Sequence, residues 1–277
     1  MKLVKVWFVA VFLLCAELNG TPLIIRTGVV NKQFQVLGWV TASYSRSNKS
    51  YNWNTEKFEP DTTSLDVFNA DLMAALGLPQ KLELSAALPV ASKKSGATSS
   101  AGPGDLMVML RYGLIQNSIL PLRAALALGA YLPTGDKYAK PALGDGSTDF
   151  GIGLLLNTAN IPFITGHLRG AYWFNGKSGE VKYGNLLEYL AVLDLGVIPG
   201  LTPELAFSGY LQNRKQVSGT EVPNSELSRG FLSILLMWKP LPRLVIRPKL
   251  AVPVKPMCKG GGLADFYPGL DIWVTLP

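Results

Sequence analysis

The amino-acid sequence predicts an all-β fold, an antiparallel transmembrane β-barrel of about twelve strands. The chain has 277 residues and is 48% hydrophobic. Beyond the N-terminus, however, no segment approaches the roughly 18 consecutive apolar residues of a membrane-spanning helix. Apolar residues instead alternate with polar ones, as they do in strands that place every second side chain in lipid. The connections between these segments alternate between short and long, which is typical of membrane barrels.

The N-terminus has the pattern of a secretory signal peptide. Two lysines precede an apolar run over residues 6–16, and Gly20 supplies a small residue at a plausible cleavage point. Acylation at Cys15 is a weaker alternative, because a bulky leucine precedes that cysteine. We therefore expect residues 1–20 to be removed. No linker or change of composition divides residues 21–277, which are expected to form one barrel domain.

Period-2 alternation is clearest in residues 104–115. Leu106, Val108 and Leu110 share one face there, and Arg111 lies on the opposite face. In a membrane barrel the charged face is the lumen, whereas in a soluble sandwich it is the outer surface. Twelve such segments give the even strand number of single-chain bacterial barrels. They cover residues 33–46, 63–76, 81–91, 104–115, 121–132, 148–158, 163–175, 184–196, 203–214, 229–238, 243–254 and 265–276.

The connections distinguish a membrane barrel from a soluble β fold. Short periplasmic turns and longer extracellular loops are the membrane-barrel pattern, and a Greek-key sandwich has no reason to keep that alternation. We expect short turns near residues 77–80, 116–120, 159–162, 198–202 and 239–242, and long loops near residues 47–62, 92–103, 133–147, 176–183, 215–228 and 255–264.

Aromatic residues fall near both ends of the expected strands. This placement is expected where a barrel crosses the two membrane interfaces, although aromatic residues also have high strand propensity. Tyr44, Tyr131, Tyr172 and Phe174 lie at loop ends, and Phe34, Tyr112, Phe163, Trp238 and Trp273 lie at turn ends.

The segment from Gly102 to Asn175 carries two specific motifs: L-P-T-G-D at Leu132–Asp136 and L-G-D-G-S-T-D-F-G-I-G at Leu143–Gly153. These motifs resemble the family described as "Putative MetA-pathway of phenol degradation", whose members are outer-membrane barrels often labelled transporters. The resemblance implies an outer-membrane location and a role in the uptake of hydrophobic or aromatic compounds. The motifs also have a structural interpretation, because glycine on the lumenal face lets other groups approach the wall closely.

The C-terminus departs from the pattern of this class. Outer-membrane barrels usually end on an aromatic residue that the barrel-assembly machinery recognises, whereas this chain ends with Pro277. Either the assembly signal is altered or the recognised aromatic residue is Trp273.

The net charge of +7 indicates that the chain can bind an anionic partner, either nucleic acid or a membrane surface. Nucleic acid is not expected, because the chain is secreted and has no basic helix or aromatic RNA-binding signature. The anionic outer-membrane lipid and lipopolysaccharide surface fits the charge better. The alternative explanation for the lysines in the loops is that loops are simply where solvated side chains lie. The lysines in or beside the long loops are Lys49, Lys57, Lys93, Lys94, Lys137, Lys140, Lys177, Lys182, Lys215, Lys255 and Lys259.

The candidate functional residues lie on the predicted lumenal face. Their charges form either a paired network that stiffens the barrel or a polar pathway. The predicted acids only partly balance the bases, so an open polar pathway is expected to prefer anions. If the solute is apolar, Met107, Met109, Tyr131 and Trp173 line the route. Arg214 is placed on the same face. The lumen-lining candidates are Arg111, Arg123, Tyr131, Asp149, His167, Arg169, Trp173, Glu188, Asp194, Glu204, Arg247 and Lys249.

No residue pattern predicts catalysis, a cofactor or a metal site. The chain has one histidine, His167, and no His/Cys cluster. We expect a channel or uptake protein of the bacterial outer membrane that takes a small solute, which the family resemblance implies to be hydrophobic or aromatic. A structural or surface-interaction barrel with a plugged lumen is the first alternative. An outer-membrane hydrolase that uses a Ser–His–acid arrangement is the second.

Overall fold

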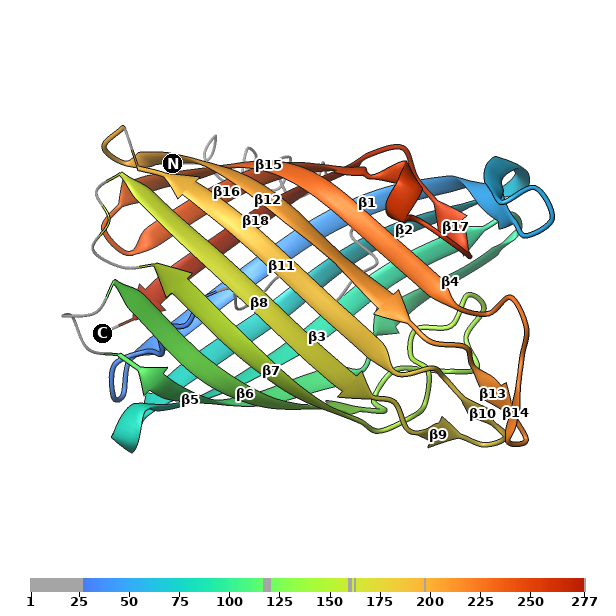
Figure 1. The fold of residues 1–277 in the computed structure, drawn as a ribbon, viewed down its shortest axis with the longest axis horizontal. Coiled ribbons are helices and arrows are strands. Elements are labelled where there is room, and N and C mark those ends of the chain that lie inside the picture. Colours follow the sequence, from blue (N-terminus) through green and yellow to red (C-terminus); the bar gives the residue numbers. More distant parts are fainter. Residues whose placement is uncertain (1–26, 117–120, 159–160, 162, 197, 277) are drawn as a thin grey trace, which may run out of the picture.

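The computed structural model describes residues 27–116, 121–158, 161, 163–196 and 198–276. Twelve long antiparallel strands form a closed barrel (Figure 1), which confirms the predicted fold class and strand number. The strands are β1 (Val36–Asn52), β2 (Lys57–Leu78), β3 (Leu82–Ser95), β5 (Leu106–Ile115), β6 (Leu122–Leu132), β7 (Asp149–Thr158), β8 (Ile164–Phe174), β11 (Leu186–Leu195), β12 (Leu201–Gln212), β15 (Leu227–Leu241), β16 (Leu244–Pro253) and β18 (Tyr267–Leu276).

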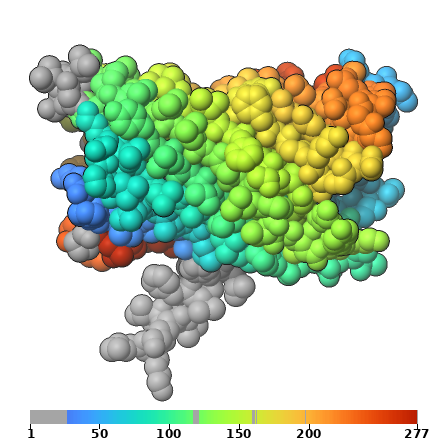
Figure 2. Space-filling view, turned by 90° about the horizontal axis from the view of Figure 1, so that it is seen from below, coloured from blue at the N-terminus to red at the C-terminus, as the bar shows by residue number. Residues whose placement is uncertain are grey.

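Each long strand pairs with the next one along the chain, and the last strand pairs with the first. Trp39 on β1 lies opposite Trp273 on β18, and Tyr44 on β1 lies opposite Phe68 on β2. This closure leaves no open sheet edge, so the backbone groups of the long strands are satisfied inside a membrane. The strands cross the barrel wall obliquely (Figures 1 and 2), as closure of a sheet into a barrel requires.

The two faces of each strand differ as the alternation predicts. On β8, Leu168 is 55% exposed on the outer wall, and its neighbour Arg169 is buried inside the barrel. The outer wall is apolar because lipid cannot satisfy charged groups, whereas the interior can pair or hydrate them. None of the described helices is long and apolar enough to cross a membrane; they are the short 3-10 turns η1 (Pro79–Lys81) and η2 (Lys255–Met257).

Long and short connections lie at opposite ends of the barrel (Figure 1). The long connections contain further short strands. Two of them continue the barrel wall, because β4 pairs with β3 and β17 pairs with β1, and the other four form a separate small sheet. The short strands are β4 (Thr98–Pro103), β9 (Lys177–Ser178), β10 (Val181–Lys182), β13 (Gln216–Val217), β14 (Thr220–Glu221) and β17 (Gly262–Leu263).

Two of the segments predicted to be long loops consist mostly of β-strand instead. Most of residues 47–62 and 92–103 continue β1, β2, β3 and β4 as hairpins beyond the alternating segments. In the first hairpin Tyr51 lies opposite Phe58, with ring centroids 5.1 Å apart. Both faces of these extensions are mostly polar, so the alternation that identifies a membrane-spanning strand is absent there.

Two of the residues predicted to lie at the membrane interfaces point into the barrel instead. The ring of Tyr131 packs against Trp173 at a centroid distance of 4.7 Å, and the ring of Trp273 lies 4.9 Å from the guanidinium of Arg247. Both occupy inward positions of their strands, so their place near a strand end does not decide their direction. Phe34, Tyr44, Tyr112, Phe163, Phe174 and Trp238 are exposed, as expected.

Candidate functional site

A buried ion pair and a buried histidine–carboxylate contact join β8 to β11 inside the barrel. Arg169 donates a 2.7 Å hydrogen bond to Glu188, and Nε2 of His167 lies 2.9 Å from Asp194. The four residues are predicted lumenal residues, and the structure brings them together in these two pairs. Both contacts link neighbouring strands of the wall, and removing Arg169 or Glu188 takes the nearest opposite charge away from a buried group.

A second charged group links β12, β16 and β18. Arg247 donates a 2.8 Å hydrogen bond to Asp271 and lies 3.3 Å from Glu204. Lys249 donates a 2.7 Å hydrogen bond to the other oxygen of Asp271. Two cations and two carboxylates therefore meet on one side of the lumen.

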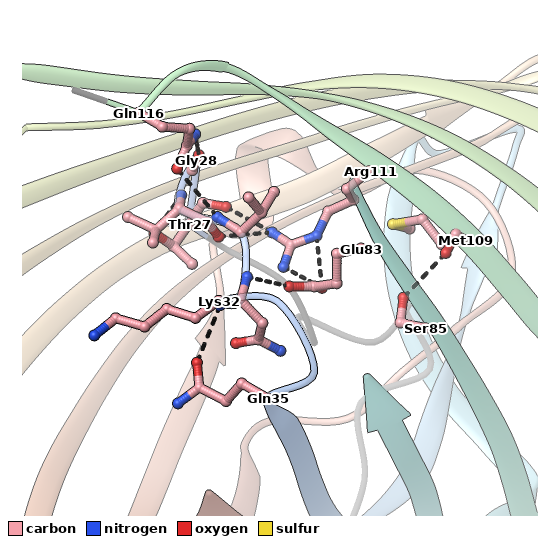
Figure 3. A network of polar contacts seen from close by, with 12 residues as sticks. Thr27, Gly28, Lys32, Gln35, Glu83, Ser85, Met109, Arg111 and Gln116 are labelled. Atoms are coloured by element: carbon pink, nitrogen blue, oxygen red, sulfur yellow. Dashed lines mark hydrogen bonds and ion pairs between the residues drawn. The ribbon is translucent and has the colours of Figure 1, made fainter. Parts of the chain in front are cut away.

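Arg111 on β5 has two roles (Figure 3). Its guanidinium bonds the buried carboxylate of Glu83 on β3, and it also donates to the carbonyl oxygens of Thr27 and Val29 at 2.9 and 3.3 Å. The other oxygen of Glu83 accepts a 2.7 Å hydrogen bond from the backbone of Asn31. This ion pair thus binds the segment that precedes the first strand.

Residues 27–35, the N-terminal segment, cross the interior at the short-turn end. Gln116 donates a 2.6 Å hydrogen bond to the carbonyl oxygen of Gly28, and Thr27 donates a 3.1 Å bond to Asn157 on β7. A side-chain Cβ at Gly28 would lie 2.8 Å from the carbonyl oxygen of Arg123, so only glycine allows this approach to the wall. The N-terminal segment therefore narrows the lumen.

An apolar cluster lies inside the barrel on the strands from β1 to β8. Its buried members, which we call the apolar lumenal cluster, come from seven different strands and include two tryptophans and three methionines. Methionine adapts its shape to its neighbours, and aromatic rings supply flat apolar surface. The members are Trp39, Met73, Ala75, Ala87, Met107, Met109, Ala127, Leu155 and Trp173, with Leu37, Tyr131, Leu186 and Trp273 packed against them.

Trp173 lies flat against glycines of β6 and β7. A Cβ at Gly129 would lie 2.7 Å from the indole ring, and a Cβ at Gly151 would lie 2.5 Å from it. Gly151 belongs to the second sequence motif, so this motif has a packing role in the lumen. Among the described residues the indole Nε1 of Trp173 has no hydrogen-bond acceptor.

Other residues of the two motifs hold a long connection in place through hydrogen bonds. Asp105 accepts hydrogen bonds from the backbone of Gly135 at 2.9 Å and of Asp145 at 3.0 Å, one from each motif. Burial raises the pKa of the Asp105 carboxyl above its ordinary value, although these two bonds lower it. Asp149 accepts bonds from Ser147 and from the backbone of Gly176. The predicted lumenal residue Asp149 therefore anchors loops at the long-loop end.

Two further arginines lie apart from the buried pairs. Arg123 lies at the short-turn end of β6, where its guanidinium donates to the carbonyl oxygen of Leu122. The placement of Arg214 in the lumen is wrong: its side chain is 48% exposed in a long connection and pairs with Glu226 at 3.0 Å. Arg214 follows the end of β12, so strand alternation does not extend to it.

The lumen is not dominated by positive charge, which corrects the expected excess. Three inward acids, Glu83, Asp71 and Asp271, are absent from the predicted set, and all are buried. The alternation of the strands could have identified these acids. Glu83, for example, is a buried residue between Leu82 and the exposed Leu84 in a clear period-2 segment. Glu83 is the acid that Arg111 on β5 contacts, Asp271 is the acid that Arg247 and Lys249 on β16 contact, and Asp71 accepts a hydrogen bond from Asn69.

Arg229 on β15 is a further inward residue that sequence reasoning missed. Its guanidinium donates to four backbone carbonyl oxygens, among them those of Gly260 at 2.8 Å and Gly262 at 2.7 Å. It therefore holds a long connection over the barrel. The local pattern of β15 does not indicate the acceptors on Lys259, Gly260 and Gly262, because these residues lie 30 to 33 positions away in the sequence.

The geometry around His167 offers little for catalysis. Its Nδ1 has no hydrogen-bond partner among the described residues, so no described serine completes a Ser–His–Asp arrangement with Asp194. Over the described ranges no group of three or more His, Cys, Asp or Glu side chains is placed to hold a metal ion.

These features define a transmembrane β-barrel of the outer-membrane type with a narrowed, partly apolar lumen. The chain belongs to the family described as "Putative MetA-pathway of phenol degradation", whose model matches residues 61–247. Its fold is similar to that of an outer membrane channel from Pseudomonas putida F1, with a TM-score of 0.77 and 13% identity over 94% of this chain and 100% of that one. The NanC porin has a TM-score of 0.54 and 11% identity over 86% of this chain and 100% of that one. No curated protein matches the sequence.

Proposed function

We propose that the protein is an outer-membrane channel for small molecules and that its lumen favours apolar or aromatic solutes. The observation that carries this proposal is the apolar lumenal cluster. A hydrated ion loses water contacts in such a segment, whereas an apolar solute gains contacts with Met107, Met109 and Trp173. The fold of the Pseudomonas putida outer membrane channel and the family membership support the same function.

The charged groups have a different role in this proposal. Arg169, Glu188, Arg247 and Asp271 are engaged with one another or with neighbours on adjacent strands. They keep the wall rigid around the apolar route and do not themselves carry the solute. They lie beside the apolar lumenal cluster, because Leu155 is the strand partner of Arg169 and the ring of Trp273 lies 4.9 Å from the guanidinium of Arg247.

A barrel with a plugged lumen is the second candidate, because one observation favours it. The N-terminal segment crosses the lumen and is bonded on two sides, to Arg111 on β5 and to Asn157 on β7. In this alternative the segment closes the barrel permanently, and function resides in the long loops.

Two measurements on the same variants separate these functions. Uptake of radiolabelled benzyl alcohol is measured in cells that express the chain, and ionic conductance is measured with purified protein in planar bilayers. We expect facilitated uptake and small conductance. Met109→Lys places a charge in the apolar lumenal cluster and is expected to reduce uptake severalfold. Ser85→Ala, a buried inward residue on the neighbouring strand, is the matched control.

The remaining outcomes contradict the proposal in distinct ways. Large conductance with unchanged benzyl alcohol uptake in Met109→Lys indicates a polar pore. Neither uptake nor conductance in wild type, together with conductance in a variant lacking residues 21–34, indicates a barrel plugged by the N-terminal segment.

A further inference from the structure

A pocket of about 310 Å3 opens among the long connections. Its frame consists of hydrogen bonds between segments far apart in sequence. The backbone N–H of Asn213 donates to Asn185 at 3.0 Å, and the backbone N–H of Lys215 donates to the Ser225 hydroxyl at 3.0 Å. The side chain of Gln212 donates to the carbonyl oxygen of Gly184 at 3.3 Å. The pocket is therefore a built feature of the loops and lies within the size range of small-molecule sites.

Four polar side chains of the pocket have unused hydrogen-bonding groups. Tyr183, Asn213, Lys215 and Asn224 line the pocket, and their side chains make no hydrogen bond or ion pair with the described part of the chain. The hydroxyl and the two amides can both donate and accept hydrogen bonds, and the ammonium group donates only. A bound molecule can satisfy all four.

The pocket has one charge that no described acid compensates. Glu226, the acid in the lining, is engaged by Arg214 at 3.0 Å and by Lys259 at 3.6 Å. These two cations lie beside the pocket, and Glu221 is a second acid near Arg214, so the two cations face two carboxylates. Lys215 adds a further positive charge, so the pocket attracts an anion.

The rest of the lining is aliphatic. Val222, Pro223 and Leu227 supply side chains without hydrogen-bonding groups. A ligand that is only a small inorganic anion leaves this surface in water, whereas a ligand with an apolar body covers it. The lining therefore combines a cation, donors and acceptors, and an apolar surface.

We propose that this pocket binds a small organic monocarboxylate with an apolar body. The carboxylate contacts Lys215, a polar substituent or the second carboxylate oxygen bonds Asn213 or Tyr183, and the apolar body packs on Val222, Pro223 and Leu227. Capture at this site does not require an open lumen, so it can fail or succeed independently of the channel function proposed above.

The test is calorimetric titration of the full chain, purified in detergent micelles, with benzoate, benzyl alcohol and acetate. Benzyl alcohol lacks the charge, and acetate lacks the apolar body. We expect saturable benzoate binding, with each of the other two at least about tenfold weaker. Lys215→Gln removes one charge-assisted contact and is expected to weaken benzoate binding about tenfold. Lys255→Gln, an exposed lysine in η2 outside the lining, is the matched control and is expected to bind as wild type does.

Three outcomes overturn the proposal. Equal affinity for all three compounds means partition into micelles. Unchanged benzoate affinity in Lys215→Gln means that the pocket is not the site. An equal loss in Lys255→Gln means that binding depends on overall loop charge.

Discussion

The guanidinium of Arg111 donates a 2.9 Å hydrogen bond to the carbonyl oxygen of Thr27 and so ties the N-terminal segment to the inner wall of the barrel. The two residues are 84 positions apart. The same guanidinium pairs with Glu83, which is fully buried. One arginine thus links the stability of the wall to the position of the N-terminal segment.

Replacing Arg111 by alanine should therefore change two properties. Glu83 is left as a buried, unpaired carboxylate, which is expected to lower the free energy of unfolding by about 3 kcal/mol. The N-terminal segment loses its bonds from β5, so ionic conductance in planar bilayers should rise. Denaturant unfolding and single-channel recording measure the two effects. Arg46→Ala, at an arginine that is 62% exposed, is the control and should change stability by less than about 0.5 kcal/mol. A stable Arg111→Ala variant with wild-type conductance contradicts this coupling.

Local alternation was sufficient to predict the fold and much of the lumen. Arg169, Glu188 and Arg247 lie on the inner face because a strand turns each second side chain the same way, which needs no knowledge of other strands. The same rule, applied to Glu83 and Asp271, would have found the acids that complete the charge balance.

The partners across the lumen could not be predicted in this way. Arg111 meets Thr27, and Trp173 meets Gly129, only because barrel closure and strand register bring distant positions together. The N-terminal segment has no periodic pattern, and its path depends on bonds from Arg111 and Gln116. Tyr131 lies near the end of its strand, and this position alone did not show whether its ring points to the membrane interface or into the barrel.

The packing of Trp173 predicts the effect of two glycine substitutions. Gly151→Ala places a Cβ 2.5 Å from the indole ring, whereas at Gly170 no described atom lies within 4 Å of the added Cβ. We expect Gly151→Ala to lower the unfolding free energy by about 1–3 kcal/mol and to alter the near-UV circular dichroism of the indole. Gly170→Ala should leave both unchanged. Equal behaviour of the two variants contradicts the packing role of the motif.

The loop contacts of Glu226 should depend on pH. Partial burial raises the pKa of this carboxyl, but the hydrogen bond and charge of Arg214 and the charge of Lys259 lower it more, so the net pKa lies below its ordinary value of 4.5. A lowered pKa in the folded state stabilises the contact above pH 4.5, and this stabilisation is lost as the pH falls through the lowered pKa. Limited proteolysis of residues 213–226 should therefore be slow at pH 7 and faster at pH 3. Glu226→Gln should be cleaved at similar rates at both values, after correction for protease activity on an unfolded standard.

The distribution of lysines predicts the orientation of the barrel and its lipid contacts. Lys57, Lys94 and Lys140 are exposed at the long-loop end, and Lys81 and Lys239 are exposed at the short-turn end. Each ammonium group near anionic lipid phosphates is stabilised by roughly 1 kcal/mol. A membrane-impermeant amine reagent applied to intact cells should modify the first three lysines and spare the other two. The opposite pattern reverses the proposed topology.

Ion selectivity tests whether the lumenal charges are balanced. Arg169 and Glu188 form a 2.7 Å pair, and Arg247 lies between Glu204 and Asp271, so wild-type protein should show little preference between K+ and Cl− in reversal-potential measurements. Glu188→Gln keeps the shape of the side chain but removes its charge, which makes the potential near Arg169 in this confined space more positive. The reversal potential should shift towards anion preference.

The reverse substitution should have the opposite sign. Arg169→Gln removes the positive charge beside Glu188 and makes the local potential more negative, so the reversal potential should shift towards cation preference. A matched shift of opposite sign in the two variants requires that both side chains face the conducting path. If neither variant shifts the reversal potential, ions do not pass this pair, and the conducting path lies elsewhere in the barrel.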